Sequence, residues 1–320
     1  MVHCRSSSSV SRFIPEGPQR LCFYSRSLVG SVASEKELWN LHHLYGASLR
    51  DLIKFAHQPN IYDAMVDKAM RRLSPGDFTK LLQIPEDVVD GCHLLISTGP
   101  LPTGRATPER KFVSAYVLER ICEQVFKNRV KEMKNLYQML QKEPTQPTAV
   151  EMLFEYQAHR FLRKKRTIRP FPIVSSNEGV CDVGEVCATG TEVVQEKFSL
   201  PKSEELVFTD EPDTPLEVGT YYRPRSTNFP TIDSWLLVRL ARQELPVLFA
   251  FHISPKKDTC DVDRSGLARV GKLVDADTRK YLIIVTPTGV QPKVTMFPAD
   301  RNLDASFLVY HLEISDKALF

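Results

Sequence analysis

The sequence of 320 residues contains no apolar run of the roughly 18 residues that a membrane-spanning helix needs. Its first residues, MVHCRSSSSVSRF, carry basic side chains but lack the apolar segment that follows them in a secretory signal. No segment recurs at a period of about 20–50 residues, which argues against a repeat architecture. We therefore expect an intracellular protein without a signal peptide and without membrane contact.

Cysteine pairs of the kind that bind zinc are also missing. The seven cysteines are an odd number and lie scattered, and the one close pair, Cys181 and Cys187 in CDVGEVC, has an unsuitable spacing. We expect reduced thiols that pack as small apolar side chains. The net charge of +3 is only mildly basic, so it permits nucleic-acid binding without arguing for it.

A phosphate-binding loop is absent as well. GPLPTGRA, at 99–106, has two glycines at the required separation, but Arg105 and Ala106 stand where lysine and a hydroxyl residue are needed. Pro100 and Pro102 also remove backbone N–H groups that would contact phosphates. We expect no ATPase activity.

The residues that are present predict an α/β protein with a helical N-terminal half. Residues 1–33 are Ser-rich and are expected to be disordered or to form a remnant strand. Ser34 and Glu37 form a predicted capping box, and the helix that follows ends at Gly46. Short helices and a strand around 91–99 come next, and apolar spacing predicts one long helical stretch over 108–142.

The segment KEPTQPT, at 142–148, breaks the helical pattern and predicts a domain boundary, with one region over 34–145 and a domain over 146–320. The second region is predicted to begin with an amphipathic helix, 149–165, and to continue through a long polar segment. Three β-rich runs follow, PTIDSWLLVRL, PVLFAFHIS and KYLIIVTP, with a helix predicted between the last two. This order favours a mixed central sheet flanked by helices.

The strongest local positive charge is RKKR at 163–166. A solvated helix end explains it, because cations are favoured near a helix C-terminus. A nuclear-import signal or a phosphate-facing patch explains it too, and the sequence leaves these interpretations open.

Two polar residues interrupt the predicted strands. Asp233 lies in the first apolar run and His252 in the second, and RLARQELP between them predicts a turn that joins antiparallel strands. An acidic side chain in such a run costs free energy unless a cationic or protic group satisfies it. On the preceding helix, Glu151, Glu155 and His159 recur at four-residue steps and could face the same cleft. Two carboxylates converging from a helix and a strand are typical of a magnesium site that assists hydrolysis.

The segments FEYQAHRFL, FPTIDSWLL and VLFAFHIS resemble the three signature segments of the PD-(D/E)xK nuclease-like domain of Crinkler and retrotransposon hot-spot proteins. ELWNLHHLYGASLRDL is similar to the end of the P-loop ATPase module in those families, and 93–121 looks like the connector that follows it. The resemblance covers roughly 34–160 and 220–290. It implies a restriction-endonuclease-like sheet preceded by an ATPase remnant.

The same resemblance implies that Glu155 and Asp233 hold a magnesium ion, with His252 where the family has glutamate or glutamine. Ser254 replaces the family's lysine or threonine, and Lys256 or Lys257 would have to supply the missing positive charge near the attacking water. Histidine is a poor magnesium ligand, so the family's pattern is degenerate at this position.

Two hypotheses follow: a degenerate nuclease-like module that cuts or binds nucleic acid, and a catalytically inactive interaction module or effector whose protein partners the sequence does not identify. A purely structural role stays open too, with Asp233 bonded to backbone amides at a strand end.

Overall fold

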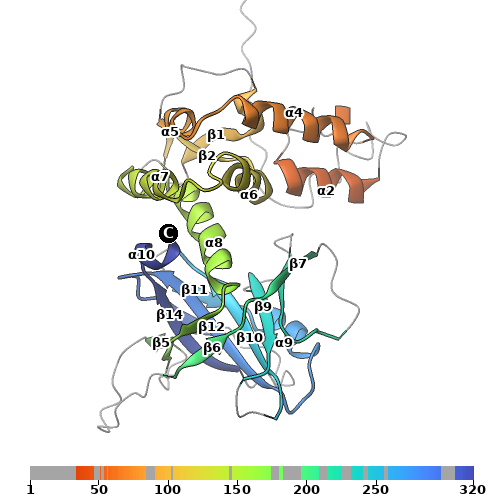
Figure 1. The fold of residues 1–320 in the computed structure, drawn as a ribbon, viewed down its shortest axis with the longest axis vertical. Helices are drawn as coiled ribbons and strands as arrows, with labels where there is room; N and C mark the ends of the chain where they lie inside the picture. The colour runs from red at the N-terminus through yellow and green to blue at the C-terminus, as the bar shows by residue number, and fades with distance from the viewer. Residues whose placement is uncertain are drawn as a thin grey trace, which may run out of the picture.

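The computed structural model describes residues 34–46, 51, 54–55, 57–83, 91–101, 104–143, 146–173, 180–182, 196–208, 215–224, 232–240, 244–255, 259–296 and 307–320. The segment 1–33 therefore lies outside the described residues, as does Lys257. The described residues form a mixed α/β protein, with helices gathered at one end and a seven-stranded sheet at the other (Figure 1).

The helical end contains α2 (Glu35–Tyr45), α4 (Pro59–Arg71), α5 (Pro75–Gln83), α6 (Ala115–Gln124) and α7 (Val130–Lys142). A short 3-10 turn, η1 (Cys92–Leu94), precedes a hairpin of β1 (Ile96–Leu101) and β2 (Gly104–Phe112). The predicted capping box is confirmed, because the Ser34 side chain accepts from the Glu37 N–H and the Glu37 carboxylate accepts from the Ser34 N–H. Gly46 ends α2 with φ of 57°, in the left-handed region that glycine tolerates.

The prediction of one helical stretch over 108–142 was wrong. Residues 108–112 belong to β2, where they pair with β1, and the helical part divides into α6 and α7. Asn128 lies in the break between the two helices with φ of 62°, a left-handed conformation that asparagine adopts more readily than most residues. The apolar spacing continues through the break because both helices pack on the same core, so periodicity alone did not reveal it.

The large sheet is mixed, with strand order β4-β14-β12-β10-β9-β8-β7. The pairs β14/β12, β12/β10 and β7/β8 are parallel, and the other three are antiparallel. The predicted adjacency of the Asp233 and His252 runs is confirmed, because β9 and β10 are neighbours and antiparallel. The strands are β4 (Phe171–Pro172), β7 (Glu204–Phe208), β8 (Thr220–Pro224), β9 (Ser234–Val238), β10 (Val247–Ile253), β12 (Arg279–Pro287) and β14 (Phe307–Ile314).

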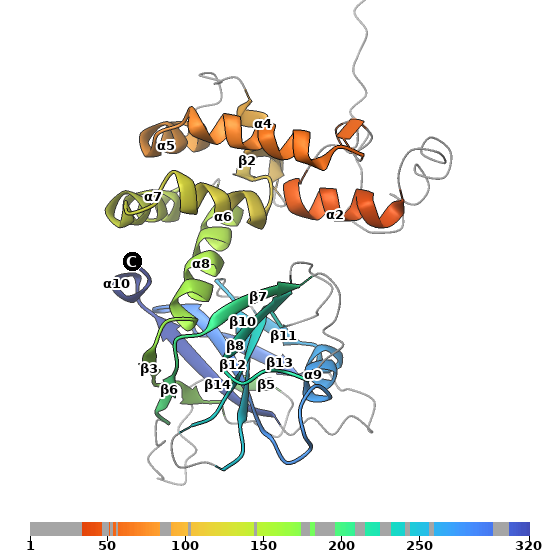
Figure 2. The ribbon, with the colours of Figure 1, turned by 45° about the vertical axis from the view of Figure 1, so that its right-hand side comes forward.

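Two smaller sheets accompany it. β3 (Arg166–Ile168) pairs with β6 (Phe198–Leu200), and β11 (Thr259–Val262) pairs with β13 (Lys293–Met296), which also pairs with β5 (Val180–Asp182). The helix predicted between the second and third β-rich runs is confirmed as α9 (Arg264–Gly271), and a last helix, α10 (Asp316–Leu319), ends near α8 (Figure 2).

Side chains alternate across the sheet and divide the core in two. Leu236, Phe249 and Phe251 belong to a cluster that continues into the helical end, whereas Trp235 and Ala250 belong to a second cluster with α9. The first cluster contains residues from both sides of the predicted boundary at 145/146, so the helices and the sheet share one continuous core.

The helix α8 (Pro147–Leu162) runs from the helical end to the sheet (Figure 1). Within the described residues, no helix combines the length and hydrophobicity that crossing a bilayer requires.

Candidate functional site

The helix α8 is buried on more than one side because it lies between α6, α7 and the sheet. Pro147 at its first turn has a backbone fixed in a helical φ and needs no N–H partner there. Leu153, Phe154 and Ala158 are buried in the shared core, and so are the polar residues Gln157 and His159. A polar side chain buried at such a junction needs a hydrogen-bond partner.

His159 finds its partner on the sheet. Its Nδ1 lies 2.8 Å from the Tyr221 hydroxyl on β8, and that hydroxyl lies 2.6 Å from Ser234 Oγ on β9. All three side chains are almost fully buried, with Tyr221 and Ser234 at 0% exposure and His159 at 3%. On the other side, His159 Nε2 lies 3.7 Å from Glu155 Oε1, one helical turn away. These four residues form a chain from α8 into the sheet, which we call the α8–sheet chain.

Asp233 and His252 meet at the edge of the sheet where β9 begins and β10 ends. Asp233 precedes β9 rather than interrupting it, so the prediction that it lies within a strand was wrong. Its N–H donates to the Phe251 carbonyl at 3.0 Å, and its Oδ2 accepts from the Ile253 N–H at 2.6 Å. The same oxygen lies 3.3 Å from His252 Nδ1. Asp233 thus extends the β9–β10 pairing by one residue, partly through its side chain. This is the structural role at a strand end that the sequence analysis left open.

The predicted catalytic residues are only partly brought together. Asp233 and His252 are in contact, but Glu155 contacts His159 instead of Asp233. Strand alternation is the physical reason, because Ser234 faces Tyr221 and α8 while the next residue, Trp235, packs in the cluster with α9. Asp233, one residue before Ser234, belongs to the Trp235 side.

The described residues contain no cluster of further ligands for the predicted magnesium ion. Within the described ranges, no group of three or more His, Cys, Asp and Glu side chains is placed to hold a metal. Asp233 Oδ2 is already an acceptor for a backbone N–H, and Lys257 lies outside the described residues. Magnesium binding therefore stays a prediction.

An ion-pair network beside the α8–sheet chain was not predicted from the sequence. Arg163 contacts Glu205 on β7, Arg223 Nε lies 2.8 Å from Glu205 Oε1, and Arg223 also contacts Glu119 on α6. These residues lie far apart in the sequence and carry no local spacing signal. The network joins the edge of the sheet to the helical end.

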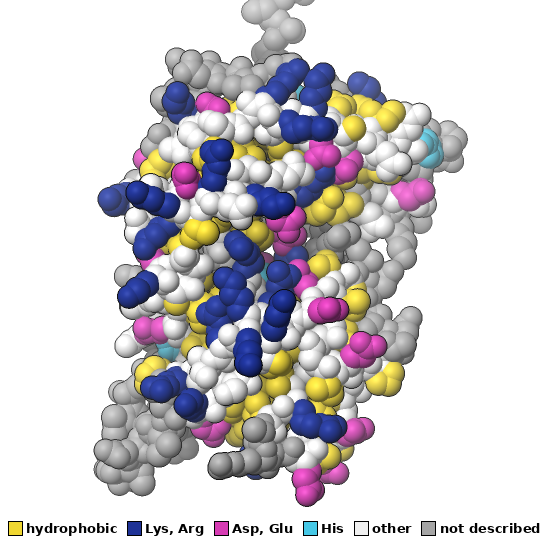
Figure 3. All heavy atoms as spheres, in the orientation of Figure 1, with side chains coloured by type: hydrophobic (Ala, Val, Ile, Leu, Met, Phe, Trp, Pro, Cys, Tyr) yellow, Lys and Arg dark blue, Asp and Glu magenta, His cyan; other side chains and the backbone are white. Residues whose placement is uncertain are grey.

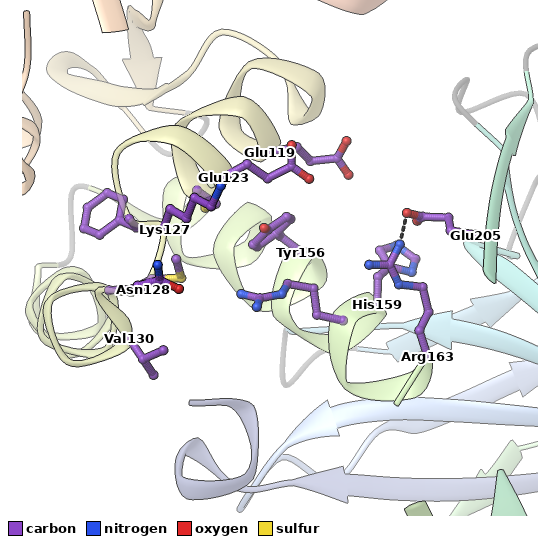
Figure 4. Close-up of a pocket in the computed structure, with 13 residues that line it drawn as sticks. Glu119, Glu123, Lys127, Asn128, Val130, Tyr156, His159, Arg163 and Glu205 are labelled. Atoms are coloured by element: carbon purple, nitrogen blue, oxygen red, sulfur yellow. Dashed lines mark hydrogen bonds and ion pairs between the residues drawn. The ribbon is translucent and has the colours of Figure 1, made fainter. Parts of the chain in front are cut away.

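A pocket of about 470 Å³ opens next to this network, between α6, the start of α7, α8 and β7 (Figure 4). Glu119, Glu123, Tyr156 and His159 are among the side chains around it, with Arg163 and Glu205 at one end. The remaining lining residues are Cys122, Phe126, Lys127, Asn128, Val130, Met133 and Arg160.

Positive charge gathers where α8 ends. Arg160, Lys164, Lys165 and Arg166 form no ion pair with any acidic residue that the structure describes, and we call these four the basic surface. Burial lowers the pKa of Lys164, and the neighbouring charges of Arg160 and Arg166 lower it further. Figure 3 shows Lys and Arg side chains gathered on this face, over α7 and the sheet end of α8.

The comparisons give no relative for this arrangement: no family model, no curated protein and no solved structure matches the chain.

Proposed function

We propose that this chain is a nuclease-like module of the Crinkler and hot-spot type that binds nucleic acid through the basic surface. The observation that carries the proposal is the unneutralised positive charge of Arg160, Lys164, Lys165 and Arg166. The mixed sheet with helices on both faces is compatible with the restriction-endonuclease-like arrangement that the resemblance implies.

The surroundings of the basic surface support phosphate as its partner. Partial burial lowers the pKa of Lys164, and the neighbouring charges of Arg160 and Arg166 lower it further, so these like charges repel one another in the free protein. An anion that bridges these side chains relieves the repulsion. Backbone phosphates supply anions at regular spacing, and their contacts dominate non-specific binding to nucleic acid. Arg166 is also held in place by its guanidinium over the Phe161 ring, 3.4 Å from the ring centroid.

Binding of a fluorescein-labelled 20-base-pair DNA tests this proposal. The double variant Lys164→Gln/Lys165→Gln removes two charges from the basic surface and should weaken binding by about tenfold or more at low salt. The control Lys68→Gln/Lys80→Gln removes two exposed charges from α4 and α5, so the net charge changes equally. Equal effects of both pairs would show that only the net charge matters and would refute the basic surface.

A second candidate function is magnesium-dependent hydrolysis of phosphodiesters. The contact between Asp233 and His252 favours it, because two of the four predicted site residues lie together at the end of β9 and β10. Incubation of labelled single- and double-stranded DNA and RNA with magnesium tests it, with Asp233→Asn as the variant. Cleavage by the wild type that the variant loses supports a nuclease. Binding without cleavage supports the inactive interaction module.

Nuclear import through residues 163–166 is a further proposal for the same segment. Of its four residues, Lys164 and Lys165 are exposed, whereas Arg163 contacts Glu205 and Arg166 packs on Phe161. An import receptor would have to compete with the contact between Arg163 and Glu205. The basic surface does not include Arg163, which favours nucleic acid as the partner of the folded protein.

A further inference from the structure

The pocket beside α8 has a small apolar wall and a larger polar rim. Phe126, Met133 and Tyr156 are nearly buried in the wall, whereas Val130 stands at its mouth with 47% exposure. Its volume of about 470 Å³ lies within the range of about 300–1,000 Å³ that is typical of small-ligand sites. The pocket can therefore hold a flat group of the size of a nucleobase.

Part of the polar rim is already neutralised inside the protein. Glu119 is paired with Arg223, and Glu205 is paired with both Arg163 and Arg223. These pairs fix the end of the pocket that faces the sheet (Figure 4). Because these carboxylates and guanidinium groups are already paired, few hydrogen-bonding groups are left for a ligand at that end.

Other groups around the pocket keep their hydrogen-bonding capacity. Glu123, Lys127 and Arg160 make no ion pair with a described residue, and the Tyr156 hydroxyl makes no hydrogen bond to one. His159, which is 3% exposed, has a second ring nitrogen, Nε2, without a hydrogen-bond partner among the described residues. Burial raises the pKa of Tyr156, so its hydroxyl stays protonated and can donate. The rim thus offers one carboxylate acceptor, one hydroxyl and two cations.

Arg160 connects the pocket to the basic surface. Its guanidinium lies over the Tyr156 ring, 5.7 Å from the ring centroid, and its charge lowers the pKa of Lys164 four residues further on. A ligand seated against Tyr156 can therefore place an anionic group between Arg160 and Lys164. A nucleotide meets both requirements, because its phosphate is anionic and its base is planar and uncharged.

We propose that the pocket takes a single unpaired nucleotide of a single-stranded nucleic acid, with its phosphate at Arg160 and its base against the apolar wall. This inference rests on the proposed function and adds that the protein prefers single-stranded nucleic acid to a duplex. Glu123 accepts hydrogen bonds from the donor edge of the base, as carboxylates do from exocyclic amino groups. A duplex cannot enter, because its bases are stacked and paired, whereas a single strand presents them freely.

The test compares fluorescein-labelled 15-nucleotide DNA as a single strand and as a duplex of the same sequence. We expect the wild type to bind the single strand about threefold to tenfold more tightly, since the pocket admits one unpaired base and the wall offers only the exposed part of Tyr156 for contact. Val130→Trp fills the mouth of the pocket and should abolish the preference. Ile61→Trp on α4 is the matched control, because Ile61 has 46% exposure and lies outside the pocket.

Two finer variants locate the base. Glu123→Gln should weaken single-strand binding by about threefold to tenfold and leave duplex binding unchanged. Glu132→Gln removes the same charge from an exposed position on α7 outside the pocket and should leave both unchanged.

Each result decides the inference. If the wild type binds both forms equally and Val130→Trp changes neither, the pocket proposal is overturned while the basic surface stands. If neither form binds even at low salt, both proposals fail. If Ile61→Trp abolishes the preference as Val130→Trp does, the effect is not local and the pocket is again excluded.

Discussion

Replacement of Tyr221 by phenylalanine tests the α8–sheet chain most sharply. The substitution removes one hydroxyl, which lies 2.8 Å from His159 Nδ1 and 2.6 Å from Ser234 Oγ. Because Tyr221 and Ser234 are at 0% exposure and His159 at 3%, water cannot easily replace the lost partner. The ring itself stays packed, so the change isolates the polar contacts.

The expected cost follows from the two polar atoms that lose a partner. A buried donor or acceptor without a partner costs about 1–3 kcal/mol, and relief from burying the hydroxyl offsets part of the sum. We therefore expect the free energy of unfolding to fall by about 2–4 kcal/mol in Tyr221→Phe, measured by urea denaturation followed by circular dichroism.

The matched control is Tyr62→Phe. Tyr62 is 2% exposed and makes no hydrogen bond to a described residue, so the free energy of unfolding should change by less than about 0.5 kcal/mol. In the double variant Tyr221→Phe/Ser234→Ala, the two costs should not add, because both substitutions remove the same bond. A loss in Tyr221→Phe as small as in Tyr62→Phe would show that the chain contributes nothing to stability.

Three further outcomes are expected. Burial lowers the pKa of His311 to about 4, so the unfolded state binds more protons than the folded state below pH 6.5. The free energy of unfolding should therefore fall by about 2 kcal/mol between pH 6.5 and 5, and His311→Gln should flatten this slope in urea titrations. Equal slopes in the wild type and the variant would contradict the assignment. Asp233→Ala removes the acceptor of the Ile253 N–H and should cost about 1–3 kcal/mol, whereas Asp233→Asn keeps an acceptor oxygen and should cost less; equal losses would exclude the strand-end role. Phe154→Ala, at a fully buried position of α8, should cost about 3–5 kcal/mol in the same assay, and a loss below 1 kcal/mol would mean that α8 is not a core element.

Local signals in the sequence predicted several elements correctly. The α2 cap follows from a capping box, and the β9–β10 pair follows from two apolar runs with a turn between them. The helix α9 was expected from its position between two β-rich runs, and the structure adds that Asp263 caps it. The capping box and the β9–β10 pair join residues that are close along the chain, so residue spacing in the sequence predicts them.

The arrangement of the candidate site was harder to predict. Asp233 and His252 were expected together and are in contact, because Asp233 directly precedes β9 and His252 lies on the neighbouring strand β10. Glu155 was expected to join them, but a one-residue step along β9 reverses the side-chain direction. The β9 residue that connects to α8 is Ser234, through the Tyr221 hydroxyl that also contacts His159. Residue spacing in the sequence does not locate the start of β9 to a single residue. It also does not show where along the sheet α8 packs.

The pocket and its ion pairs lay beyond sequence analysis for another reason. Glu119, Arg163, Glu205 and Arg223 come from four different elements, and only the packing of α8 between the helices and the sheet brings them together. Single charged residues on amphipathic elements look like ordinary solvated positions until that packing is known.

The salt dependence of DNA binding tests the central claim most directly. If the basic surface contacts phosphates, a plot of the logarithm of the binding constant against that of the salt concentration should be linear, with a slope of about −3 to −4 for three to four contacts. The Lys164→Gln/Lys165→Gln variant should make that slope shallower by about 2. A wild-type protein that binds no DNA at 50 mM salt, or whose slope the variant leaves unchanged, would contradict the account.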